Sequence, residues 1–289
     1  FKNTNIKFVG FEPSSNVAIK ANKKNIKTLN NFFNLDNISN LREYIKKTKV
    51  ICAANVICHI PNLNELISTI DKLLVSDGVF IFEEPYLGSM FEKTSYDQIY
   101  DEHIYMFSAH SIKKIFNLYN FDLIDLKPQI THGGSMRYVT ARKGKYEINS
   151  SVNHILNQEK KLELDNLNSC LNFKKQCELS KEKTVSQLND FKKEGKSICG
   201  YAATSKSTTI LNYCNIGPNV IDYICDTTTE KIGKFSPGMH IPIKSPEYFK
   251  ENIPDIAYLF AWNHKNEIFL KEKDFTEKRK GKWFSHVSL

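Results

Sequence analysis

Apolar and polar residues in the first half of the chain alternate between strand-like and helix-like patterns. Apolar runs over residues 6–11, 49–58 and 79–83 predict strands. The run over 49–58 is nearly continuous, which is typical of a strand buried on both faces of a sheet. Helical spacing over about residues 15–23 and 63–74 predicts helices between these strands. Strands separated by helices in this way indicate a mostly parallel sheet with helices on both faces.

The rest of the chain repeats this alternation after a long helical stretch. Residues 153–193 have a helical pattern rich in lysine and glutamate, and Gly195 follows where a helix would end. The pattern over 136–142 alternates as one strand of an antiparallel edge pair would. The other predicted elements are strands over 123–128, 197–201, 220–225 and 256–260 and a helix over 207–213.

We therefore predict an α/β fold with two Rossmann-like domains. The first covers residues 1–152, a helical linker covers 153–195, and the second α/β domain covers 196–289.

Composition and charge narrow the class of protein. The chain is 41% hydrophobic and has no apolar run of roughly 20 residues and no secretory signal, so we expect a soluble protein without a membrane partner. Its net charge of +8 comes from lysines mixed with acids along helices, which speaks against nucleic-acid binding. The seven cysteines form no CxxC pair, which predicts reduced thiols, a cytoplasmic location and no metal site within this chain.

Four candidate positions, three of them polar, follow the first predicted strands. Glu12 stands where a carboxylate can accept ribose hydroxyls, or it is an acid that favours the start of a helix. Ala54 is small enough for a ligand to approach closely, and Asn55 offers donors and an acceptor. His59 lies at the mouth of the same sheet edge, where it is either catalytic or structural.

Residues 96–103 carry the densest group of polar and aromatic side chains. If they are helical, Tyr96, Tyr100 and His103 share one face, and Glu102 points about 100° away from His103. A histidine near neutral pH suits proton abstraction, which typically contributes 10²–10⁴-fold in rate. The alternative is a polar helix whose acids face water.

Two loops complete the set of candidates. His132 lies in a glycine turn that either contacts a ligand or only reverses the chain. Residues 200–209 join a strand to a helix, and Thr204 and Lys206 there form either an anion site or a plain helix cap. Neither a P-loop nor a GxGxxG dinucleotide loop is present, which argues against a nicotinamide oxidoreductase.

Several strings resemble a known family in the same order along the chain. The similarity runs from about residue 6 to residue 284, and the family is that of the class I S-adenosylmethionine-dependent C-methyltransferases that act on nucleotide-linked keto-deoxysugars. The strings are GFEPSSNVA, ANVICHIPNL, YDQIYDEHIYMFS, THGGSMRY, GYAATSKSTTILNYCNIGP, DTTTEKIGKFSPGMHIPI and PDIAYLFAWNHKNEI.

The resemblance implies roles for these residues. It implies S-adenosylmethionine as cofactor, with Glu12 on its ribose and Ala54 and Asn55 beside its methionine end. It also implies that His103 is the base, with Tyr100, Glu102 and His59 around the reacting sugar. The second α/β domain is expected to bind no cofactor and to help hold the sugar nucleotide, through Thr204, Lys206, His132 and His240.

The chain also departs from the family. Family members carry a zinc-binding domain with four cysteines and then a glycine-rich cofactor loop before the part that matches here. Since the chain begins at Phe1, we expect a fragment or a trimmed chain, with zinc only in the missing domain. Ala202 also replaces a glycine that is common in the family.

The resemblance predicts a C-methyltransferase that methylates a carbon next to a ketone, with His103 as general base. One alternative is an O- or N-methyltransferase acting on a sugar. Another is a non-catalytic fragment that binds a sugar nucleotide. The sugar, the nucleotide, the carbon and the oligomeric state stay open.

Overall fold

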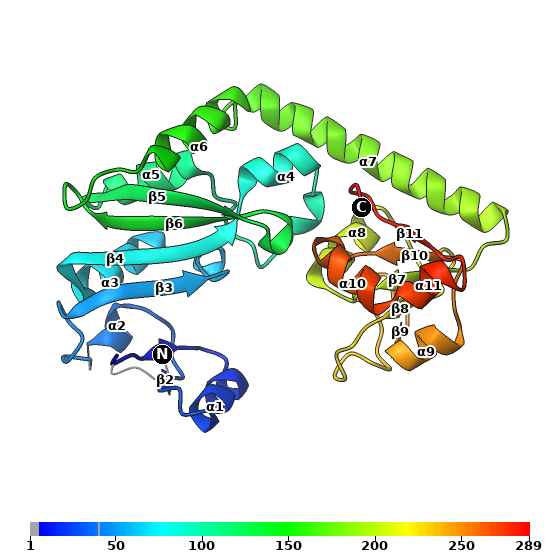
Figure 1. Ribbon diagram of the computed structural model, residues 1–289, viewed down its shortest axis with the longest axis horizontal. Coiled ribbons are helices and arrows are strands. Elements are labelled where there is room, and N and C mark those ends of the chain that lie inside the picture. The colour runs from blue at the N-terminus through cyan, green and yellow to red at the C-terminus, as the bar shows by residue number, and fades with distance from the viewer. Residues whose placement is uncertain (1–5, 40) are drawn as a thin grey trace. The chain divides into compact units, whose positions relative to one another are not determined.

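The computed structural model describes residues 6–39 and 41–289, which form two compact units (Figure 1). Unit 1 consists of the residues up to Glu84, of Ala109–Lys127 and of Arg137–Ile155. Unit 2 consists of Pro85–Ser108, Pro128–Met136 and Leu156–Leu289. Two segments that the sequence analysis placed in the first domain, 85–108 and 128–136, thus group with the C-terminal residues.

Unit 1 is built on a four-stranded sheet. Its strand order is β3 (Thr48–Ala54), β4 (Leu74–Pro85), β6 (Ser135–Arg142) and β5 (Phe121–Gln129). The strands β3 and β4 pair in parallel, as do β1 (Gly10–Phe11) and β2 (Thr28–Leu29) in a separate two-stranded sheet. The predicted alternation of strands and helices is therefore confirmed for this unit.

The helices of unit 1 begin where local side chains can satisfy their first amides. The α3 helix (Leu63–Leu73) begins after Asn62, whose side chain accepts a hydrogen bond from the amide of Glu65. Its apolar positions recur at helical spacing, so Leu66 and Ile70 are buried against the sheet. The remaining helices are α1 (Ser15–Lys23), α2 (Leu35–Ile38) and α5 (Ala109–Asn117), with a 3₁₀ turn η1 (Ile57–His59) after β3.

Two expectations about strand position in unit 1 were wrong. The β3 strand is not buried on both faces: it is an edge strand of the described sheet, and 50% of Val50 is exposed. Within the described part of the chain, only β4 pairs with it, so an apolar run is not enough to predict a central strand. Conversely, β6 is an interior strand, because it lies between β4 and β5.

Stacked aromatic rings fill the core of unit 1. Phe80 and Phe82 of β4 stack on Phe116 of α5, and Phe82 also stacks on Tyr138 of β6 at 4.8 Å between ring centroids. Burial of each phenyl ring contributes roughly 1.5–3 kcal/mol, so these rings fix α5 against the sheet.

Unit 2 contains a five-stranded parallel sheet. The order is β11 (Lys282–Phe284), β10 (Ile256–Leu259), β7 (Ile198–Tyr201), β8 (Tyr223–Cys225) and β9 (Ile243–Lys244). Strand order reverses between β7 and β10, which is the doubly wound arrangement of a Rossmann-like fold. The predicted second α/β domain is thus confirmed in its architecture.

Both faces of this sheet are buried. Alternate residues of β10 point to opposite sides, so Tyr258 belongs to one apolar cluster and Leu259 to the other. The first cluster is covered by α7 (Leu167–Lys193) and α8 (Ser205–Tyr213), the second by α9 (Pro246–Glu251) and α11 (Lys273–Glu277). The α6 helix (Ser150–Lys161) precedes α7, and α10 (Lys265–Lys271) precedes α11.

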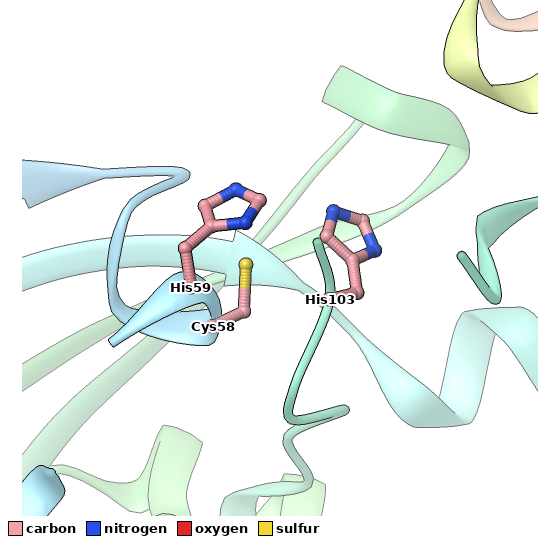
Figure 2. Close-up of side chains that lie close together, drawn as sticks. All are labelled: Cys58, His59 and His103. Carbon is pink, nitrogen blue, oxygen red and sulfur yellow. The ribbon is translucent and has the colours of Figure 1, made fainter. Parts of the chain in front are cut away.

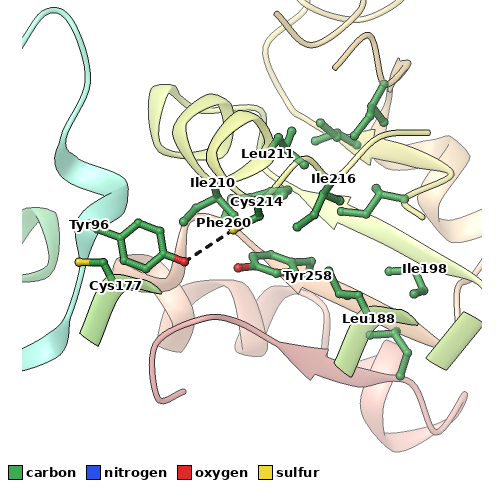
Figure 3. Packing of buried hydrophobic residues seen from close by; sticks show 14 residues of the cluster. Tyr96, Cys177, Leu188, Ile198, Ile210, Leu211, Cys214, Ile216, Tyr258 and Phe260 are labelled. Carbon is green, nitrogen blue, oxygen red and sulfur yellow. Dashed lines mark hydrogen bonds between the residues drawn. The ribbon is translucent and has the colours of Figure 1, made fainter. Parts of the chain in front are cut away.

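The long α7 helix ends as the sequence predicted. Gly195 has a φ of +74°, the left-handed conformation that commonly closes a helix and that glycine adopts without strain. Leu188 of the same helix is fully buried in the cluster shown in Figure 3.

Residues 96–103 do not form the predicted helix. Helical structure is confined to the 3₁₀ turn η2 (Tyr96–Gln98), which follows α4 (Leu87–Lys93), and Ile99 is extended. The Tyr96 ring is buried in the core of unit 2, where its hydroxyl lies 3.8 Å from the sulfur of Cys214 (Figure 3). Tyr96 therefore shares no helix face with Tyr100 and His103, because burial of its ring outweighed the local helical pattern.

Candidate functional site

In unit 1, Glu12 directly follows β1. Its amide donates to the carbonyl of Leu29, which continues the β1–β2 pairing. One carboxylate oxygen accepts the amide of Ser14 at 2.8 Å, so the acid also supports the start of α1. A carboxylate is thereby held at the carboxyl end of a parallel strand, where ligands of such sheets bind.

Asn55 ends β3 in a left-handed conformation with a φ of +53°. Its amide donates to the carbonyl of Glu83 at 2.8 Å. Its Oδ1 atom is buried and accepts no hydrogen bond from any residue that the structure describes. An unsatisfied buried acceptor costs about 1–3 kcal/mol, so this atom fits a ligand that brings an N–H or O–H donor.

The turn after Asn55 is held by an acid that the sequence analysis missed. Glu84 is fully buried, and its carboxylate accepts the amides of Val56 and Ile57 at 3.0 and 2.7 Å. Cys58 and His59 lie on the turn η1 so formed (Figure 2). Burial, followed by the charge of Glu84, raises the pKa of the Cys58 thiol. A signal was present, since Glu84 is a second acid at the end of a buried strand.

In unit 2, His103 lies on the loop after η2 and is the third side chain drawn in Figure 2. Its Nδ1 atom lies 2.8 Å from the carbonyl oxygen of Gln98. A carbonyl can only accept a hydrogen bond, so Nδ1 carries the hydrogen and Nε2 carries the lone pair of the neutral ring. The arrangement fits a general base that acts through Nε2.

Tyr100 and Glu102 belong to the same short turn. The amide of His103 donates to the carbonyl of Tyr100 at 2.9 Å, and the two rings contact each other at an interplanar angle of 32° with centroids 4.0 Å apart. Glu102 is exposed on this turn. The structure therefore brings Tyr100 to His103, whereas the helix expected to do so does not form.

His132 occupies the left-handed position of the turn η3 (Thr131–Gly133), with a φ of +52°. Its carbonyl accepts a hydrogen bond from Lys206, and the carbonyl of Gly133 accepts one from Lys93. Gly133 has a φ of +88°, and a Cβ there would overlap the ring of Trp262. The glycine is thus required by a tight turn packed on tryptophan, while ligand binding by the exposed His132 side chain stays a prediction.

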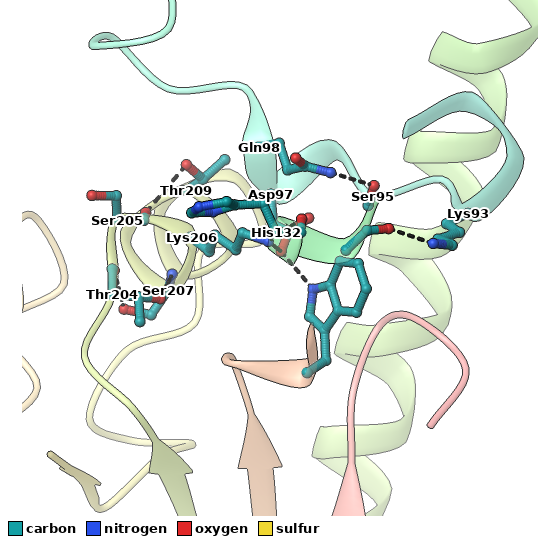
Figure 4. Close-up of polar contacts among 12 residues, drawn as sticks. Lys93, Ser95, Asp97, Gln98, His132, Thr204, Ser205, Lys206, Ser207 and Thr209 are labelled. Carbon is teal, nitrogen blue, oxygen red and sulfur yellow. Dashed lines mark hydrogen bonds and ion pairs between the residues drawn. The ribbon is translucent and has the colours of Figure 1, made fainter. Parts of the chain in front are cut away.

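Thr204 and Lys206 stand at the start of α8. The Thr204 side chain accepts the amide of Ser207 at 3.2 Å, so it caps the helix. Lys206 is buried, and its ammonium lies 4.0 Å from the carboxylate of Asp97 (Figure 4). The same ammonium lies 4.7 Å from the centre of the Trp262 ring. Burial lowers the pKa of Lys206, against the opposite effect of Asp97. Direct contact of either residue with a substrate stays a prediction.

His240 lies in the loop before β9 and is exposed, with a left-handed φ of +54°. Its amide donates to the carbonyl of Ser236 at 3.0 Å. These contacts define the loop and leave the predicted role of His240 in substrate binding untested.

A cleft of about 300 Å³ opens at the carboxyl ends of β7 and β8 in unit 2, with Asp226 and His264 among its lining residues. The Asp226 carboxylate accepts the amides of Ala203 and Thr228 at 2.6 and 2.7 Å, so its oxygens hold the two loops that form the cleft.

Sequence reasoning also missed a buried polar group in unit 2. Asp97 and His286 have fully buried side chains. The carboxylate of Asp97 accepts a hydrogen bond from the indole of Trp262 at 2.7 Å. Asp97 stood within a string already singled out, but nothing local marked Trp262 or His286 as its partners.

Comparisons with known proteins agree with this two-part architecture. Residues 130–287 match the family model described as C-methyltransferase C-terminal domain, and residues 1–126 match one described as Methyltransferase domain. The C-methyltransferase NovU of Streptomyces niveus is 28% identical over 278 residues, which are 96% of this chain and 66% of NovU. The chain thus spans about two thirds of the length of this curated relative.

Solved structures resemble about half of the chain. The PH0226 protein from Pyrococcus horikoshii OT3 has a TM-score of 0.38 and 14% identity, covering 49% of this chain and 74% of its own. A SAM-dependent methyltransferase, possible histamine N-methyltransferase, from Thermotoga maritima has a TM-score of 0.37 and 17% identity, covering 46% and 72%. Among the described residues, no helix has the length and hydropathy to cross a membrane.

Proposed function

The chain belongs to the C-methyltransferase family, and from this premise we propose that it takes part in the transfer of a methyl group from S-adenosylmethionine to a carbon atom. The observation that carries the proposal is the hydrogen bond between His103 Nδ1 and the Gln98 carbonyl. It leaves Nε2 as the basic atom, and methylation of carbon requires a base because the carbon has no lone pair.

Three residues of unit 1 are suited to hold the cofactor, which supplies an electrophilic methyl group when bound. Asn55 Oδ1 is a buried acceptor that lacks a donor within the described chain. Glu12 offers a carboxylate at a strand end for the ribose hydroxyls, and Ala54 leaves room beside Asn55.

We propose a nucleotide-linked keto-deoxysugar as substrate, on the resemblance stated above. A ketone acidifies the hydrogens on the neighbouring carbon. His103 Nε2 takes one of these protons, and the C–H electron pair becomes part of an enolate whose negative charge rests on the ketone oxygen. The bound cofactor would supply the methyl group that this enolate carbon accepts, with the electron pair of the methyl–sulfur bond remaining on sulfur.

Other residues complete the proposed site. Tyr100 and His59 are the candidate donors to the enolate oxygen, worth about 2.7–4 kcal/mol of transition-state stabilisation for one well-placed donor. Glu102, His132, Thr204, Lys206 and His240 are the candidate contacts to the sugar nucleotide. A reducing, cytoplasmic location is part of the proposal and is supported by the seven free cysteines.

The proposal is tested by proton exchange at the sugar carbon, which separates base catalysis from methyl transfer. The probes are nucleotide-linked keto-deoxysugars in D₂O without cofactor, and deuterium uptake at the carbons next to the ketone is followed by NMR. We expect His103→Asn to slow uptake and methyl transfer by about 10²–10⁴-fold. Calorimetric titration should show S-adenosylmethionine binding unchanged, because His103 does not hold the cofactor in this scheme.

His154→Asn is the control, because this exposed histidine of α6 has no part in the proposed site. Equal deuterium uptake in His103→Asn and His154→Asn would overturn the assignment of the base. NMR of the product decides the reaction class. A new C–CH₃ signal supports the proposal, whereas a methoxy or N-methyl signal would show O- or N-methylation instead. Absence of cofactor binding would favour a sugar-nucleotide-binding protein.

A further inference from the structure

A buried polar network lies at the carboxyl ends of β7 and β10 in unit 2. Asp97 of η2 is its centre, with Trp262 donating at 2.7 Å and the Lys206 ammonium at 4.0 Å. His286 Nε2 lies 3.5 Å from the other carboxylate oxygen, and His286 Nδ1 lies 3.1 Å from the hydroxyl of Tyr258. The partners of Asp97 all come from segments far along the chain from it, and Trp262 is 165 residues away.

This position is where open parallel sheets bind their ligands, and here η2 of the same chain occupies it. An isolated carboxylate would not be stable at this depth, because burial of an unpaired charge costs several kcal/mol. Lys206 also donates to the carbonyl of His132, so the network joins η2 to the glycine turn η3 (Figure 4). The Asp97 carboxylate therefore fixes η2 in place.

Fixing η2 also fixes the atom that orients the proposed base. Gln98 follows Asp97 directly, and its carbonyl oxygen is the 2.8 Å acceptor for His103 Nδ1. The Gln98 side chain donates to Ser95 at 2.9 Å, and Thr209 of α8 donates to the carbonyl of Ile99 at 3.4 Å. The Gln98 side chain and the carbonyl of Ile99 are thus restrained on either side of the Gln98 carbonyl.

We propose that Asp97 is a positioning residue for His103. Through Trp262, Lys206 and His286 it holds η2 so that the Gln98 carbonyl keeps the His103 ring protonated on Nδ1, with Nε2 as the basic atom. A role in packing alone does not require a carboxylate, since replacing a buried ionic group by apolar residues of similar volume is often neutral or stabilising. The inference rests on the proposed role of His103 as base.

The test uses Asp97→Asn, which keeps the shape and an acceptor for Trp262 but removes the charge. The readout is the ¹⁵N spectrum of histidine-labelled protein, in which His103 is assigned by its loss in His103→Asn. We expect wild-type His103 to show the Nδ1–H tautomer and Asp97→Asn to show a mixture of both. Deuterium uptake and kcat should fall about 10–100-fold with little change in KM, the size typical of partners that orient an active group.

Glu272→Gln is the matched control. Glu272 is another buried carboxylate of unit 2, and its partners are Tyr201, whose hydroxyl it accepts at 2.8 Å, and the ammonium of Lys271 at 3.7 Å, both outside η2. We expect its replacement to leave the His103 tautomer unchanged. If Asp97→Asn does not fold, as judged by circular dichroism, His286→Gln removes one partner of Asp97 and should give the same mixture of tautomers.

An unchanged tautomer in the folded Asp97 or His286 variant would overturn the proposal. An equal change in Glu272→Gln would overturn it too, because the effect would then be general loosening of unit 2. Failure of the proposed function is recognised separately: wild-type protein would show no deuterium uptake, whereas the tautomer spectrum does not depend on turnover.

Discussion

Ala202 has a backbone conformation that costs free energy for any residue with a side chain. It follows β7 with a φ of +76°, and its amide donates to the carbonyl of Cys225 at 2.7 Å. A side chain in this left-handed region costs roughly 1–2 kcal/mol, and glycine avoids that cost. The glycine that the family commonly has at this position thus has a physical reason.

We expect Ala202→Gly to stabilise the protein by up to about 1 kcal/mol. Relief of strain outweighs the larger backbone entropy of glycine in the unfolded chain, which costs about 0.4–1 kcal/mol. Urea unfolding measures the difference. The neighbouring Ala203→Gly is the control, because Ala203 lies outside the left-handed region and should lose stability. Stabilisation of both variants, or of neither, contradicts this explanation.

At the scale of the element, carboxylates organise the loops that carry the candidate residues. Glu84 holds η1 through main-chain amides, Asp97 holds η2, and Asp226 accepts amides from the loops after β7 and β8. Glu84 and Asp226 compensate main-chain amides that short turns leave without partners, whereas the partners of Asp97 are side chains from later segments. We therefore expect each turn to depend on its acid.

The element-scale prediction concerns Glu84→Gln. A neutral amide accepts more weakly than a carboxylate, so we expect the loss of about 2 kcal/mol in the free energy of unfolding. Faster alkylation of the buried Cys58 should accompany it, because η1 loses its anchor. The adjacent Glu83→Gln breaks a half-exposed ion pair with Arg137 and should cost under about 1 kcal/mol. Equal losses in the two variants would rule out a special role for Glu84.

At the scale of the whole molecule, we expect the protonation of one carboxyl group to dominate the loss of folding stability at acid pH. Several acids have lowered pKa values, but Asp77 and Asp274 are exposed and paired with lysines. Burial alone would raise the pKa of Asp97, yet His286, Lys206 and Trp262 outweigh it, so its pKa lies below the ordinary value of 3.8. A carboxyl lowered on folding stabilises the protein above its unfolded pKa of about 3.9 and loses this effect as pH falls through the folded pKa.

We therefore expect the melting temperature of wild-type protein to fall steeply below about pH 4. Asp97→Asn should be less stable at neutral pH by about 3 kcal/mol, because the buried ammonium of Lys206 loses its carboxylate partner, and its melting temperature should vary less below pH 4. Thermal unfolding followed by circular dichroism from pH 3 to pH 7 measures both effects. The melting temperature of Asp274→Asn should equal that of wild type at every pH. If the melting temperatures of Asp97→Asn and wild type fall equally below pH 4, this account is wrong.

The sequence by itself determined where most helices and strands lie and that both halves of the chain are α/β. The α3 helix and the strands β7 and β10 appeared where their patterns predicted, because periods of 3.6 and 2.0 residues are local properties of helix and strand. The family resemblance identified His103 and Asn55 as candidates, and the structure gives each a suitable local geometry. The string around His103 was thus visible in advance, although its conformation was not.

Only the tertiary structure decided how that string folds and what holds it. Asp97 and Trp262 are 165 residues apart, so no local pattern relates them. The expected helix over 96–103 fails because Tyr96 is buried in a core formed by residues beyond position 170. Likewise, β3 is an edge strand of the described sheet because the position of a strand depends on which other strands pair with it, and an apolar run does not specify those strands. Periodicity predicts which residues of a helix or strand face inward, and only the folded chain determines which residues they contact.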